Sequence, residues 1–195
     1  MEKLKFTKAF SYPFNRLGGL LNILWVFLPI FGWFALGGYT VRIIQEFSAG
    51  KFEELPRFKF VDNMKLGFWM LIKAIPFALA YMAALFVLGA LVRVSLSYNF
   101  FMGIIELFLG IFVVPILSIN FFNKETVESY FEFKILLNVF NNIEDYIIAF
   151  LKDVALAIIF VFMSIILIGI PAGSFTRNIF IADFYRRKVK PDFTK

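Results

Sequence analysis

Three charged residues, Lys73, Glu106 and Asp153, interrupt otherwise apolar stretches of this 195-residue chain. They are the side chains best placed for chemistry, because ionisable groups inside membrane-type segments are costly and mark ion or proton pathways. The chain contains no histidine and no cysteine. This excludes thiolate and histidine-ligated metal sites, iron–sulfur clusters, and Ser–His–Asp or Cys–His catalysis. We therefore assign no catalytic, cofactor-binding or metal-binding residue, and expect no cofactor.

Lys73 and Asp153 are the first candidate pair. Each lies about seven residues inside its segment, roughly 10 Å deep at 1.5 Å per helical residue. If both segments enter from the same face, pairing offsets a cost of about 2.5–3.5 kcal/mol for an isolated Lys or Asp at a span centre. The alternative is that Lys73 extends to the interface and Asp153 pairs with Lys152 or water. The sequence predicts the ion pair, with extension as the competing interpretation.

Glu106 is the best single candidate for an ion- or proton-handling carboxylate. It lies about 9 Å in from the opposite face, by the same helical rise. Arg16, Arg93 and Arg177 are expected within its reach.

The composition identifies the solvent that these segments meet. Hydrophobic residues make up 61% and charged residues 17% of the chain, against about 45–50% and about 25% in average soluble proteins. A soluble domain of this size cannot bury so much apolar surface. The net charge is +6, and its basic residues cluster beside apolar segments, where they meet lipid headgroups rather than nucleic acid. The chain is predicted to be an all-α, polytopic transmembrane helical bundle.

We expect one integral membrane domain over residues 1–195, with four spans at about 17–44, 66–92, 100–122 and 146–170. Each is long enough for a hydrocarbon core of about 30 Å. In the first, Pro29 and several glycines predict a kinked span, with a re-entrant pair of half-helices as the alternative. Gly169, Pro171 and Gly173 should break the last span, which leaves 172–185 as a fifth half-span or an interfacial helix.

Three segments that mix apolar and charged residues are predicted to lie at the membrane surface, at about 1–16, 51–65 and 124–143. The tail 186–195 is basic and expected to be solvated. In the third segment, apolar residues recur at three- and four-residue steps and predict an amphipathic helix: Phe133, Leu136, Leu137, Phe140 and Ile143. The candidate partner interface comprises Tyr130, Phe131, Phe133 and Phe140.

The distribution of Lys and Arg predicts an orientation. With four spans, the termini and the short link 93–99 share one face, which carries eleven of these residues. The face with the two long links, link one (46–65) and link two (123–145), carries seven. The positive-inside rule therefore predicts a multi-pass protein of the cell membrane with cytoplasmic termini.

Several short motifs follow one another in an order that resembles a known family. They are Tyr12-Pro13-Phe14, Gly18-Gly19, Pro29, Gly38-Tyr39 with Arg42, Gly50, Leu55-Pro56, Asn63 and Gly67-Phe68, and later Phe131-Glu132-Phe133-Lys134 and Asn142 to Tyr146. Over roughly residues 10–185 the chain resembles the archaeal and bacterial membrane family called domain of unknown function 4013. The resemblance implies a multi-span fold and no established activity or catalytic residues.

The function expected from these observations is a non-enzymatic accessory or scaffold subunit of a membrane complex. Its partners would be the lipid bilayer and other membrane subunits or a second copy, with no nucleic acid. The alternative is a small oligomeric transporter or channel that uses Glu106 and the Lys73–Asp153 pair. A lipid-modifying enzyme ranks third, because no His, Cys or cluster of carboxylates is available.

Overall fold

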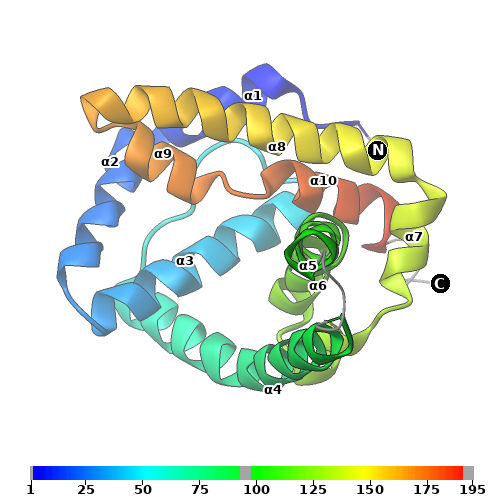
Figure 1. The fold of residues 1–195 in the computed structure, drawn as a ribbon. Helices are drawn as coiled ribbons and strands as arrows, with labels where there is room; N and C mark the ends of the chain where they lie inside the picture. Colours follow the sequence, from blue (N-terminus) through cyan, green and yellow to red (C-terminus); the bar gives the residue numbers. More distant parts are fainter. Residues whose placement is uncertain (1, 93–97, 191–195) are drawn as a thin grey trace.

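The computed structural model describes residues 2–92 and 98–190, and every regular element in these two ranges is helical (Figure 1). The elements are α1 (Phe6–Ser11), η1 (Tyr12–Arg16), α2 (Leu17–Leu20), η2 (Leu21–Phe27), α3 (Phe31–Ser48), α4 (Phe60–Val92), α5 (Tyr98–Phe108), the π-helical turn η3 (Leu109–Val113), α6 (Val114–Lys124), η4 (Val127–Phe131), α7 (Ile135–Asn141), α8 (Ile143–Met163), η5 (Ser164–Ile166), α9 (Gly169–Phe175) and α10 (Ile179–Lys188).

Three of the described helices are long and apolar enough to cross a membrane: Phe60–Ala90, Phe100–Lys124 and Ile143–Ile166. They correspond to the second, third and fourth predicted segments. The helical fold and the three candidate spans agree with the sequence prediction of an all-α membrane protein. Figure 1 looks nearly down α5 and α6, whereas α3 and α8 run across the view, so these helices do not form a parallel bundle.

The first predicted segment, 17–44, is not a single kinked span. Helix η2 ends before Pro29, the backbone reverses at Ile30 with a φ of 67°, and α3 returns beside η2. The reversal is tight, because a Cβ at Gly32 would lie 1.8 Å from the Trp25 carbonyl oxygen. Proline ends the incoming helix since it lacks an N–H and its ring clashes with the preceding turn. The predicted alternative, two half-helices, describes this segment.

A second reversal follows α8. Leu167 adopts a φ of 64°, and α9 folds back beneath α8, as the orange ribbon in Figure 1 shows. Gly169 permits the close approach, because a Cβ there would lie 2.0 Å from the Phe160 carbonyl oxygen. At the break predicted near Gly169, the chain therefore reverses its direction. The stretch 172–185 becomes the end of α9 and most of α10.

Helix α10 lies at the centre of the molecule and packs against α3, α6 and α8. Seven consecutive residues, Ile179–Tyr185, are buried, so this stretch is not an interfacial helix. A helix buried on all sides must pair each of its polar side chains. Its polar residues in this stretch are Asp183 and Tyr185, and both have hydrogen-bond partners.

A proline also shapes the third span. Pro115 cannot donate a backbone hydrogen bond to the carbonyl of Ile111, four residues earlier. The helix relaxes into the π turn Leu109–Val113 just before the proline. The Ile111 carbonyl instead accepts a 2.6 Å hydrogen bond from the hydroxyl of Tyr146 on α8. A helix defect thus becomes a contact between two candidate spans.

The described ends of the chain and the first long link lie together. The side-chain nitrogen of Asn15 donates to the Glu53 carbonyl at 2.6 Å, and Lys190 donates to the Ser48 carbonyl at 3.4 Å. Such contacts cannot extend across a hydrocarbon core of about 30 Å. The predicted separation of the termini from this link onto opposite faces is therefore wrong. The reason is the reversal at Ile30, after which α3 runs back to the side on which the N-terminal segment lies.

The predicted amphipathic helix in link two is shorter than expected. Helix α7 covers only Ile135–Asn141, and buries Ile135 and Val139. Most of the apolar set singled out in the sequence faces outward, with Phe133, Leu137 and Phe140 exposed.

Candidate functional site

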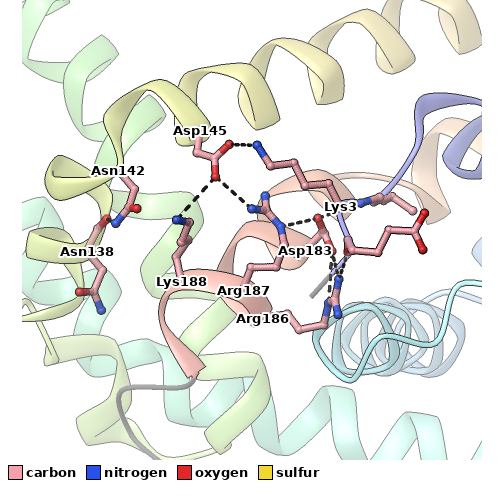
Figure 2. Close-up of polar contacts among 10 residues, drawn as sticks. Lys3, Asn138, Asn142, Asp145, Asp183, Arg186, Arg187 and Lys188 are labelled. Carbon is pink, nitrogen blue, oxygen red and sulfur yellow. Dashed lines mark hydrogen bonds and ion pairs between the residues drawn. The ribbon is translucent and has the colours of Figure 1, made fainter.

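The densest group of charges joins the N-terminal segment, the start of α8 and the end of α10 (Figure 2). We call it the charged junction; it comprises Lys3, Asp145, Asp183, Arg186, Arg187 and Lys188. Asp183 accepts from Arg186 Nη2 at 2.6 Å, from Arg187 Nε at 3.0 Å and from the backbone N–H of Leu4 at 3.1 Å.

Asp145 forms the second centre of the junction. It pairs with Lys3, with Arg187 Nη1 at 3.0 Å and with Lys188 at 3.9 Å. Arg187 thus bridges the two carboxylates, and its side chain is only 9% exposed. Because both carboxylates are engaged by cations, we interpret the junction as a structural clamp. It holds the N-terminal segment onto α8 and α10.

The junction corrects one prediction. The sequence predicts Arg186 and Arg187 in a solvated tail, but both side chains are largely buried and pair with Asp183. Their spacing from Asp183, three and four residues along one helix, is the signal that could have revealed the cluster. Residues 191–195 of the predicted tail lie outside the described residues.

A second polar network runs through the other side of α10. The Tyr185 hydroxyl donates to Asn120 Oδ1 at 2.7 Å, and Asn120 Nδ2 donates to the Ser129 carbonyl at 2.7 Å. Glu132 accepts from Asn120 and pairs with Lys124. Burial raises the pKa of Tyr185 to about 12, so the phenol stays protonated as a donor. Asn120 therefore joins α10 to link two.

The predicted Lys73–Asp153 pair does not form. Lys73 Nζ donates to the backbone carbonyl of Glu125 at 2.7 Å. The Asp153 carboxylate accepts the backbone N–H groups of Phe180 and Ile181, at 3.2 and 3.1 Å. Asp153 thus caps the N-terminus of α10, where helix N–H groups have no partner within the helix. The sequence showed the depth of both residues but not the helix end that one of them meets.

Glu106 lies exposed on the outer side of α5, among exposed apolar side chains that include Phe100, Ile104 and Leu107. Within the described part of the chain it makes no hydrogen bond or ion pair, including with Arg16, which donates to the Leu55 carbonyl. Arg93, another predicted partner, lies outside the described residues. Glu106 is therefore an unsatisfied carboxylate on an apolar helix surface.

The candidate partner interface divides into two parts. Tyr130 is buried and stacks between Phe77 and Phe121, with ring centroids 4.3 and 4.2 Å apart. The prediction that Tyr130 belongs to a partner interface is therefore wrong. Phe131, Phe133 and Phe140 are exposed by 38%, 52% and 45% and stay available to a partner.

No group of three or more acidic side chains with metal-binding geometry occurs in residues 2–92 and 98–190. Comparison with known proteins found no match among curated proteins and none among solved structures. The model of one family, described as a protein of unknown function (DUF4013), matches residues 21–169. The match covers both chain reversals and all three candidate spans but ends before α10. The chain therefore belongs to the DUF4013 family.

Proposed function

We propose that the protein is a non-enzymatic accessory or scaffold subunit of a membrane complex, which docks a second membrane helix on the outer face of α5. The observation that supports this proposal is that Glu106, in the candidate span Phe100–Lys124, has no partner among residues 2–92 and 98–190. An ionised side chain at the centre of a span costs about 2.5–3.5 kcal/mol on insertion scales. A polar side chain on a neighbouring helix would offset that cost.

The surface around Glu106 suits a close helix contact. Gly103 lies three and four residues before Glu106 and Leu107, and Gly110 lies four and three residues after them, so the four residues share one helix face. A Cβ at either glycine would meet no atom within 4 Å. Small residues let two membrane helices approach closely, and polar side chains then hydrogen-bond across the contact. We call this surface the Glu106 face, and its expected partner helix carries Lys, Arg, Asn or Gln at the matching depth.

Site-specific photocrosslinking in native membranes tests the proposal. A photoreactive residue at Leu107 should form an adduct with another membrane protein, because Leu107 is 63% exposed beside Glu106. The same residue at Ile158, 52% exposed on α8, serves as the matched control for lipid exposure alone. Glu106→Leu should abolish the Leu107 adduct and Glu106→Gln should retain it, since Gln still hydrogen-bonds. Glu128→Leu, on an exposed link residue, should change nothing.

The chain's lack of cysteine makes self-association easy to recognise. A cysteine at Gly103 forms an intermolecular disulfide only if two copies meet through the Glu106 face. A Gly103→Cys disulfide dimer without a foreign adduct, together with ion flux lost in Glu106→Gln, would replace the scaffold with the oligomeric transporter. The absence of both protein adduct and dimer would remove the docking proposal.

Link two offers a second contact surface for the same complex. Phe131 and Phe133 are exposed, and their rings lie 6.4 Å apart, edge to face. Aromatic side chains suit surfaces that are half apolar and half wet. Replacing both with Ser should release a partner bound to this link while leaving the candidate spans inserted. If the doubly substituted protein retains all its partners, link two is only a lipid contact.

A further inference from the structure

The helices α8 and α9, which are joined by the turn at Leu167, leave a cavity of about 510 Å³ between them. Its α8 wall includes Asp153, Val154, Ala157 and Val161, and its α9 wall includes Ile170 and Ser174. Thr176, Arg177 and Asn178 line it where α9 gives way to α10. Most of the wall is therefore apolar, with its polar groups at the break between two helices.

Most polar groups of this cavity are already paired. The hydroxyls of Ser164, Ser174 and Thr176 each donate to a carbonyl four residues earlier in the chain. Asp153 accepts from the N-terminus of α10. Within the described residues, the side chains of Arg177 and Asn178 make no hydrogen bond or ion pair. These two side chains are the donors that the cavity leaves free.

The charge balance of the cavity favours an anion near Arg177. The negative charge of Asp153 faces the positive end of the α10 dipole, which partly offsets it. Arg177 has no carboxylate within ion-pair distance in the described chain.

We propose that the α8–α9 cavity binds one anionic phospholipid, with its phosphate on Arg177 and Asn178 and an acyl chain along the apolar walls. A guanidinium binds phosphate through two parallel hydrogen bonds, and an amide adds a further donor. The apolar walls match a hydrocarbon chain, and α8 is itself a candidate span with exposed apolar residues along its length. Basic pockets between membrane helices are known binding places for anionic headgroups.

Native mass spectrometry of the purified protein tests this inference. The protein is taken from vesicles of equal parts phosphatidylglycerol and phosphatidylcholine. The wild type should retain one phosphatidylglycerol per chain and little phosphatidylcholine. Arg177→Gln should reduce the retained phosphatidylglycerol by about fivefold, the scale of one basic residue at an anionic membrane surface. Ala157→Phe, which fills the cavity without changing a charge, should reduce it similarly.

Two matched controls separate the cavity from general effects. Arg57→Gln removes an exposed arginine elsewhere, and Ala155→Phe enlarges an exposed alanine on α8 that does not line the cavity. Both should retain phosphatidylglycerol as the wild type does. Equal retention by all variants, or equal retention of the two lipids, overturns the proposal. Displacement of the lipid by millimolar inorganic phosphate would assign the site to a free anion instead.

Discussion

Individual charged side chains in this protein differ in whether the chain itself satisfies them. The side chain of Asp183 is 3% exposed, forms ion pairs with two arginines and accepts one backbone N–H. Asp153 accepts two backbone N–H groups from the N-terminus of α10, whereas Glu106 has no hydrogen bond or ion pair within the described chain. The first two therefore serve the fold, and the third is the residue on which the proposed docking of a partner helix rests. This distinction depends on tertiary contacts and cannot be read from the position of a charge within an apolar segment.

Asp183→Asn should be among the most damaging single substitutions. It leaves Arg186 without a carboxylate partner and Arg187 with Asp145 alone, although both arginine side chains are largely buried. Removing one partner of a buried ion pair costs about 3–5 kcal/mol, and we expect a loss of that order in the free energy of unfolding, measured by titrating mixed micelles with dodecyl sulfate. Asp62→Asn is the control, because its pair with Lys59 is exposed and 4.0 Å long. The control should lose less than about 0.5 kcal/mol. Equal losses would show that the junction does not carry stability.

Lys73 and Asp153 should behave as independent residues. Each has its own backbone partner, so the losses in Lys73→Met and Asp153→Leu should add in the double variant to within about 0.5 kcal/mol. The measurement is a double-mutant cycle in the same denaturant titration. A coupling above about 1 kcal/mol would restore the ion pair that the sequence suggested.

At the scale of elements, the sequence predicted the helices better than their ends. The second, third and fourth apolar segments are candidate spans close to their predicted bounds. The first segment was ambiguous because Pro29 suits either a kink or a reversal, and only the close contact of Gly32 with the Trp25 carbonyl decides between them. The burial of α10 was also out of reach. The spacing of Asp183 from the two arginines indicates pairing along one helix, but the burial of α10 depends on Asp145 of α8, which meets Arg187 and Lys188.

The crossing of α3 and α4 provides a sharp test of close packing. A Cβ at Gly38 would lie 1.9 Å from the Asn63 carbonyl oxygen, while one at the neighbouring Gly37 would meet nothing within 4 Å. Gly38→Ala must push the helices apart and should cost about 3 kcal/mol or more. Gly37→Ala should be neutral or stabilising by up to about 1 kcal/mol, because alanine favours the helix. Thermal unfolding in detergent would compare the two. A tolerated Gly38→Ala would mean that the helices do not cross here.

The whole molecule is organised around one polar side. Residues of the N-terminal segment contact link one through Asn15 and Glu53, and contact α8 through Lys3 and Asp145. The described C-terminal end contacts the end of α3 through Lys190 and Ser48. The sequence-based topology is wrong at this scale because it counts 17–44 as one membrane crossing. A segment that reverses instead leaves the chain before it and the chain after it on the same face of the membrane. Counting charges cannot correct an error in the number of crossings.

Single-cysteine labelling tests this arrangement, and the chain has no native cysteine to interfere. Cysteines at Lys5, Lys51 and Glu144, all exposed, should react with a membrane-impermeant maleimide from the same side. The surrounding basic residues predict that this side is cytoplasmic by the positive-inside rule.

A cysteine at Leu167 should react only after detergent is added. Ile165, Ile166 and Leu167 form an exposed apolar turn at 83%, 69% and 71% exposure, which belongs in hydrocarbon rather than water. If Lys5 and Lys51 react from opposite sides, the chain crosses the membrane between them and the reversal at Ile30 does not exist. If Leu167 reacts in intact vesicles, the α8–α9 turn lies in water, and the candidate span Ile143–Ile166 then crosses the membrane completely.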